Sequence, residues 1–231
     1  MPQHMQINSV IGLLPKLSLT LHLAKCLKKY ISSKIFQEKS DSDCTHREII
    51  TAVKKGRSSL IKKLNLIYLL VAIISCTLIS IVQYISEGHE KIYFNPFFVV
   101  FWCIVLFSRV HEIFCAFLLD AFDTLNNRVK SSSLSNASRL ELSLRSYIEL
   151  ILNFSLFYYI VPESFWKDCE SVGGISESIY FSGVTITTLG YGDITPINPL
   201  VQIVTVYEVL CGFTLLIISF SMYTSKASRC S

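Results

Sequence analysis

The stretch Thr185-Ile-Thr-Thr-Leu-Gly-Tyr-Gly-Asp193 decides what this sequence is expected to build. Gly190 and Gly192 lie on either side of a tyrosine, and glycine adopts positive φ without a steric penalty. A backbone that alternates such residues turns successive carbonyl oxygens to one side. A ring of these oxygens from several chains can replace the hydration shell of a bare cation, with the Thr188 hydroxyl at the inner end. We expect the ring of Tyr191 to point away from that axis, into packing behind the strand.

On either side of this stretch, apolar residues occur in long runs. Hydrophobic residues make up 51% of the 231 residues and charged residues only 16%, whereas a soluble domain carries about 25% charged residues. This composition is too apolar for a nucleic-acid-binding protein or a disordered chain. Four segments are long enough to cross a bilayer as helices. They are residues 64–85, 94–122, 140–161 and 200–223.

The segment between the third and fourth spans is too short for a separate domain. Its middle, residues 178–189, is moderately apolar, which suits a short helix that enters the membrane and returns inside a protein shell. The sequence therefore predicts an all-α membrane protein with four transmembrane helices. A short re-entrant helix at 177–187 lies between the third and fourth of them.

The basic residues predict the orientation of these spans. Residues 1–63 hold 12 lysines and arginines, and the loop at 120–146 holds four more. The loops on the opposite side hold one each, Lys91 and Lys167. The positive-inside rule then places both termini in the cytoplasm of a multi-pass cell-membrane protein. The outer segment 162–199 is acidic, which raises the local cation concentration at its mouth.

The central motif resembles that of the potassium-channel pore family, whose filter reads T-x-G-Y-G-D after a short pore helix. The resemblance covers about residues 140–223, and an aspartate follows the filter as in most members. It implies that backbone oxygens of one short segment coordinate K⁺, with no covalently bound cofactor. The coordinating residues implied are Thr188, Leu189, Gly190, Tyr191 and Gly192, with K⁺ ions at the first four.

The resemblance also assigns residues that support the filter. Tyr180 and Phe181 occupy the positions of an aromatic cuff behind it, and Tyr180 replaces a frequent tryptophan. Val184 stands where some members carry a glutamate that binds the aspartate after the filter, so that buttress is absent. Leu189 replaces the commoner valine. The support residues implied are Thr187, Asp193, Tyr180, Phe181, Val184 and Glu208.

The fourth span carries the candidate gate. Gly212 lies where many members of the family have a hinge glycine in the inner helix. Leu216 and Phe220 follow at intervals of four residues, either as an apolar constriction or as ordinary helix packing. Glu208 lies four residues before Gly212 on the same helix face. We favour a structural role for this carboxylate, hydrogen-bonded behind the pore helix, over a direct functional one.

The family needs four filter strands around one axis and this chain supplies one, so the resemblance implies a homotetramer. No arginine recurs at every third position, so the subunit is a four-span one without a voltage sensor. We expect a potassium-selective channel that conducts passively. The alternatives are a poorly selective monovalent cation channel and a non-conducting membrane adaptor that uses the pore unit for assembly. An enzyme is disfavoured, because no set of catalytic or metal-binding residues stands out.

The chain divides into five expected parts. Residues 1–63 form a basic cytoplasmic region, 64–122 a two-helix transmembrane hairpin and 123–139 a cytoplasmic linker. The pore domain follows at 140–223, and a short cytoplasmic tail at 224–231. An amphipathic basic helix, or two, is expected within residues 9–36, either solvated or held on anionic lipid. The sequence indicates no nucleic-acid partner.

Local signals predict where helices begin and how three polar residues behave. Thr45–Glu48 and Ser138–Glu141 have the spacing of capping boxes, and the first opens a basic helix that can run on into the first span.

Arg109 and Glu112 are spaced to pair, with His111 between them. We favour a helix end that projects into the cytoplasm over a buried charge cluster with His111 as a proton sensor. No cysteine pair has CxxC spacing, and a bond between subunits through Cys169 stays open.

Overall fold

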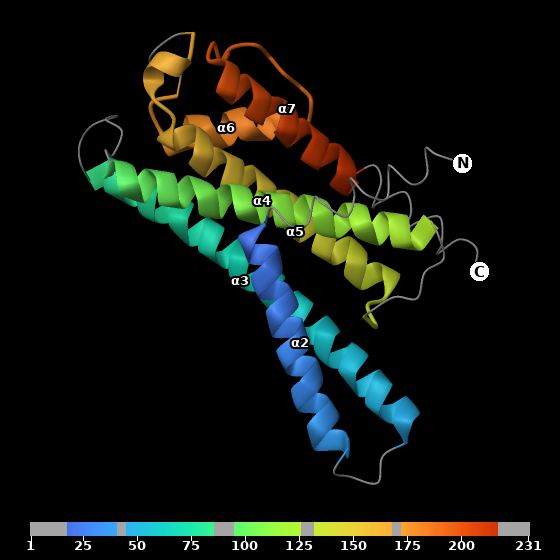
Figure 1. Ribbon diagram of the computed structural model, residues 1–231. Helices are drawn as coiled ribbons and strands as arrows, with labels where there is room; N and C mark the ends of the chain where they lie inside the picture. Colours follow the sequence, from blue (N-terminus) through green and yellow to red (C-terminus); the bar gives the residue numbers. More distant parts are fainter. Residues whose placement is uncertain (1–17, 41–44, 86–94, 126–131, 168–171, 217–231) are drawn as a thin grey trace.

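The computed structural model describes residues 18–40, 45–85, 95–125, 132–167 and 172–216, and these form an all-helical bundle without strands (Figure 1). The predicted fold class, an all-α membrane protein, is confirmed. The helices are α2 (Leu19–Ser40), α3 (His46–Ile85), α4 (Pro96–Leu125), α5 (Asn136–Ile160), α6 (Ile175–Ile186) and α7 (Pro199–Phe213), and a 3-10 turn covers Glu163–Phe165.

Three helices in the described part of the chain, α3, α4 and α7, are long and apolar enough to cross a membrane. The third expected span, α5, has 25 residues but is not among them. It packs against α3, α4, α6 and α7, and Ser146, Glu149 and Asn153 are buried between these neighbours. Because α5 faces protein on most sides, its composition is set by helix–helix contacts and not by lipid.

The long helix α3 begins as the sequence predicts. The backbone N–H of Thr45 donates to the Glu48 carboxylate at 2.9 Å, which completes one half of a capping box. This hydrogen bond holds the pKa of the Glu48 carboxyl below its ordinary value. The helix then continues for 40 residues, so the basic stretch runs on into the first span without a break, as the sequence allows.

The start of α5 corrects a second expected cap. The helix begins at Asn136, and Ser135 is the residue whose side chain accepts the N–H of Ser138, at 3.2 Å. Ser138 is therefore inside the first turn and is not the cap. The serine-rich sequence offers several possible caps, and the earlier serine adds another turn of helix to the packed end of α5.

The helices divide into a bundle and an arm. Helix α2 runs beside the N-terminal half of α3, and this pair projects away from α6 and α7 (Figure 1). A glycine permits the close approach, because a Cβ on Gly56 would lie 2.4 Å from the Ile35 side chain. The basic N-terminal region is therefore a helical hairpin that α3 continues into the bundle, and the start of α2 also contacts α4. Residues 1–17, which include Pro15, lie outside the described residues.

Candidate functional site

The filter segment has a backbone in which every second residue has positive φ. The φ angles are 62° at Thr188, 53° at Gly190 and 78° at Gly192. Two of these positions are glycines, for which this conformation carries no Cβ penalty. The third is a β-branched threonine, for which it is unusual. The alternation that the sequence predicts for a carbonyl ladder is therefore present in the backbone, without the ions or partner chains that a filter requires.

The upstream end of this segment is fixed by the C-terminus of α6. The N–H groups of Leu189 and Gly190 both donate to the Val184 carbonyl, at 3.0 and 3.4 Å, and the N–H of Thr188 donates to Thr185 at 2.9 Å. The Thr187 hydroxyl donates to the Gly183 carbonyl at 2.6 Å. The carbonyl end of a helix carries partial negative charge, so the segment begins where a cation is favoured.

The downstream end is fixed by the loop before α6. Trp166 and Pro196 form an antiparallel bridge. The N–H of Lys167 donates to Thr195 at 3.0 Å, and that of Ile197 donates to Phe165 at 2.9 Å. The segment between α6 and α7 is thus held at both ends by backbone hydrogen bonds, which leaves its middle free to face outward.

The two aromatic residues expected behind the filter, Phe181 and Tyr180, make different kinds of contact. Phe181 is buried with its ring centroid 4.9 Å from Tyr158 and 5.0 Å from Trp166, both edge-on. Such pairs add about 0.5–1.5 kcal/mol each beyond burial. Tyr180 stays 42% exposed and donates its hydroxyl to Asp193 Oδ2 at 2.7 Å. The buttress that Val184 cannot supply is therefore provided by Tyr180, four residues earlier.

Removing this hydroxyl is expected to change the titration of Asp193. The Tyr180 hydroxyl holds the pKa of the carboxyl below its ordinary value of 3.8. Because the pKa is depressed, the hydrogen bond stabilises the loop above pH 3.8 and is lost as the pH falls through the lowered value. Tyr180→Phe should return the pKa towards 3.8, measured by NMR on ¹³C-labelled aspartate.

The matched control for this titration is Tyr30→Phe on the exposed face of α2. It removes a tyrosine hydroxyl far along the chain and should leave the Asp193 resonance unchanged. An Asp193 pKa that is identical in the wild type and in Tyr180→Phe would show that the bond is not made in solution. The Asp193→Asn variant assigns the resonance.

Glu208 lies behind the pore helix, as favoured from the sequence. Its side chain has no exposed surface. The Tyr158 hydroxyl donates to Glu208 Oε2 at 2.7 Å, and the Ser182 hydroxyl donates to Oε1. The carboxyl thus joins α5, α6 and α7 at one point. Neither hydroxyl partner could be found from the sequence, since each lies more than 25 residues away.

Gly212 is a point of close contact between α6 and α7. A Cβ there would lie 2.8 Å from Ile186 Cγ1 and 3.0 Å from the Ile186 carbonyl oxygen. Immediately after it, α7 widens into a π-turn at 214–216, which is a common local deviation at functional sites. Leu216 is 37% exposed. Phe220 and the tail at 224–231 lie outside the described residues.

Gly212→Ala is expected to destabilise the protein by about 1–3 kcal/mol, because the added methyl group overpacks the contact with Ile186. Thermal unfolding in detergent measures this effect. Gly183→Ala is the control, since a Cβ on that α6 glycine would meet nothing within 4 Å. Equal stability of the two variants would contradict the close contact and would leave the hinge prediction as the remaining role for Gly212.

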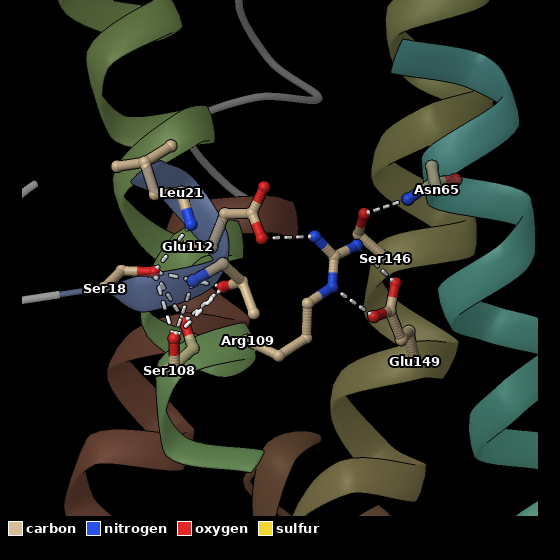
Figure 2. A network of polar contacts seen from close by, with 9 residues as sticks. Ser18, Leu21, Asn65, Ser108, Arg109, Glu112, Ser146 and Glu149 are labelled. Carbon is tan, nitrogen blue, oxygen red and sulfur yellow. Dashed lines mark hydrogen bonds and ion pairs between the residues drawn. The ribbon is translucent and has the colours of Figure 1, made fainter. Parts of the chain in front are cut away.

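The polar residues of α4 lie in contacts with other helices, and whether this end of α4 projects into the cytoplasm stays a prediction. Arg109, His111 and Glu112 are all buried, at 8%, 5% and 7% exposure. Arg109 makes two hydrogen bonds to Glu149 of α5, at 2.6 and 3.0 Å, and an ion pair with Glu112 at 2.8 Å (Figure 2). Its guanidinium carbon lies 4.0 Å from the centroid of the Tyr68 ring.

His111 joins the same helix to the candidate pore. Its Nδ1 lies 2.9 Å from the Tyr207 hydroxyl of α7, and its ring stacks beside Phe107. The alternative of a buried charge cluster therefore describes the geometry, although a proton-sensing role stays a prediction. The sequence signal for this site was an arginine and a glutamate inside apolar helices, which mark internal contacts in membrane proteins.

A comparison with protein families finds one matching model. It is described as an ion channel, and it matches residues 146–229. This range contains most of α5, the pore helix, the filter segment and α7. The recognition of a channel pore unit is therefore confirmed at the level of the ion-channel model, and the chain is a membrane protein.

Two curated relatives match part of this chain. "Two pore potassium channel c" of Oryza sativa subsp. japonica is 37% identical over 57 residues, which are 25% of this chain and 12% of the relative. "Protein LctB" of Bacillus caldotenax is 29% identical over 113 residues, or 44% of this chain and 82% of the relative. The chain thus spans about an eighth of the rice relative. No solved structure matches it.

Proposed function

We propose that this protein is a potassium-selective channel that conducts K⁺ passively through a pore formed by four copies of the chain. The observation that carries the proposal is the alternation of positive φ at Thr188, Gly190 and Gly192. With this alternation, the carbonyl oxygens of Thr188, Leu189, Gly190, Tyr191 and Gly192 would line one side of the segment and replace the hydration shell of K⁺. The name of the rice relative, a potassium channel, supports K⁺ as the ion.

The exposed surface of the pore unit supports assembly with further copies. Leu189 and Tyr191 of the filter segment are 61% and 68% exposed. A stripe on α7 continues this apolar surface, opposite the face that buries Glu208. The exposed residues of the stripe are Ile203, Val206, Leu210 and Phe213. A single chain leaves this surface and its carbonyls uncovered, and three more copies around the filter axis would cover both.

The proposed orientation puts the filter mouth outside and both termini in the cytoplasm. The uneven distribution of lysine and arginine supports it. In this orientation the α2–α3 arm with its basic residues extends into the cytoplasm, and α5 crosses the membrane behind the pore. No covalent chemistry is proposed, and the K⁺ ions are the transported species and not bound cofactors.

The test is ion uptake into proteoliposomes that contain the purified full-length protein. K⁺ uptake should exceed Na⁺ uptake by a wide margin, and empty vesicles of the same lipid give the background. Equal uptake of the two ions would favour a poorly selective cation channel. The adaptor alternative would take over if no uptake occurred across a range of pH and voltage, with and without residues 1–40.

A further inference from the structure

The start of α2 is held against the middle of α4 by three hydroxyl-bearing residues. Ser18 Oγ donates to the backbone carbonyl of Ser108 at 2.8 Å, and Thr20 Oγ1 donates to the same carbonyl at 3.1 Å. The N–H of Thr20 donates to Ser108 Oγ at 3.0 Å. All three residues are buried, and Figure 2 shows Ser18 facing Ser108 across the two helices.

This contact adjoins two others on the same turn of α4. Arg109, the next residue, binds Glu149 of α5, the helix that packs most extensively on the pore helix. His111 lies within hydrogen-bond distance of Tyr207 on α7. Three positions within one turn of α4, Ser108, Arg109 and His111, therefore connect the N-terminal arm to the outer helix and to the helix that would line the pore.

The structure shows the hydroxyl contact in its docked arrangement. When docked, its polar groups satisfy one another away from water. A partial separation would leave buried hydroxyls and a carbonyl without partners, which is unfavourable. A complete separation would let water satisfy them. A contact that can be either docked or separated can shift a conformational equilibrium elsewhere in the protein. This requires that the docked and separated arrangements make different contacts with the helix that moves.

We infer that Ser18, Thr20 and Ser108 form a latch through which the α2–α3 arm controls pore opening. This inference rests on the proposed channel function. When the latch is docked, α4 is fixed against α2, and the His111–Tyr207 contact places α7 relative to α4. When it opens, α4 is free to shift relative to the arm, and α7 shifts with α4 through the His111–Tyr207 contact. The filter is not altered, so the ratio of K⁺ to Na⁺ flux stays the same.

A reversible cross-link tests the latch. Thr20 Oγ1 and Ser108 Oγ lie 3.2 Å apart, which brings the two side chains close enough for a disulfide. In the Thr20→Cys/Ser108→Cys variant in proteoliposomes, oxidation should change K⁺ flux by about threefold or more, and reduction should restore it. The two single-cysteine variants control for the native cysteines and should show no redox effect. A purely structural contact would not give a reversible change.

Three results would overturn the latch. One is a cross-linked protein with the flux of the reduced protein, and another is failure of the disulfide to form. The third is additive effects of Ser18→Ala and Ser108→Ala on flux, because partners in one contact must be coupled. Ser75→Ala on the exposed face of α3, where the hydroxyl binds only its own helix, is the control.

The latch and the channel function can fail separately. A wild-type protein that passes no K⁺ contradicts the channel function. In that case, hydrogen exchange of residues 199–213 in the oxidised and reduced double-cysteine variant decides the latch. Slower exchange after oxidation would support coupling between α2 and α7, and unchanged exchange would refute it. If the wild type conducts K⁺ but the cross-link leaves the K⁺ flux of the double-cysteine variant unchanged, only the latch is contradicted.

Discussion

Gly190→Ala is expected to abolish K⁺ uptake, to the level of empty vesicles, in a protein that still folds. The φ of 53° at Gly190 lies in the left-handed region, where an L-residue with a Cβ is disfavoured by about 1–2 kcal/mol. Relief of this strain would rotate the peptide groups on either side and turn their carbonyls away from the axis. The alternation with Thr188 and Gly192 would then be broken at its centre.

The effect of Gly190→Ala should come from the backbone and not from packing. A Cβ at Gly190 would meet nothing within 4 Å in the chain, so helical content should stay at the wild-type level. Gly183→Ala adds the same methyl group to an open position in α6, without positive φ, and should keep K⁺ uptake. Wild-type uptake by Gly190→Ala would mean that these carbonyls do not form the conducting path.

The parts of the fold that the sequence predicts correctly depend on neighbouring residues. The filter backbone follows from two glycines and a tyrosine within nine residues. The cap at Thr45 follows from a carboxylate three positions later, and α3 from a basic segment that continues without a proline into an apolar span. Each of these features is set by interactions within one or two turns of chain. Whether the filter residues coordinate K⁺ stays a prediction, because no ion or partner chain is part of the structure.

The features that the sequence could not predict are long-range pairs. Arg109 was expected near the end of a span, because an arginine in an apolar run usually marks an interface with water. Its partner Glu149 lies 40 residues further along the chain, and no periodicity connects the two. Tyr180 was expected to pack behind the filter, and only the folded loop brings Asp193 within reach of its hydroxyl.

A helix with many buried polar residues is also hard to recognise as a membrane span from hydropathy. Helix α5 was predicted as a span from its apolar second half, and the structure confirms the helix. Its first half carries Arg139, Ser143 and Ser146, all buried. The Asn65 amide of α3 donates to the Ser146 hydroxyl at 2.8 Å (Figure 2). Such contacts allow a helix to be polar where it faces other helices, and a single sequence does not say which face that is.

Arg109→Met is expected to lower the free energy of unfolding by about 3–5 kcal/mol, because it leaves two buried carboxylates without their shared cation. Glu149 has no exposed surface and Glu112 is 7% exposed. Glu149→Gln should be milder. Arg109 keeps its ion pair with Glu112, and the glutamine oxygen still accepts a hydrogen bond. Adding Glu149→Gln to Arg109→Met should recover part of the loss, since the second charge no longer needs a partner.

Arg145→Met is the matched control for this series. Arg145 pairs with Glu141 on the exposed side of the same bundle, where the side chains are 34% and 52% exposed. A surface pair of this kind contributes about 0–1 kcal/mol. Denaturant unfolding of the four variants in one detergent compares the two sites directly. If Arg109→Met lost no more stability than Arg145→Met, Arg109 would have to be solvated. The helix end would then project into the cytoplasm as the sequence alone suggests, and the contact between α4 and α5 would not exist in solution.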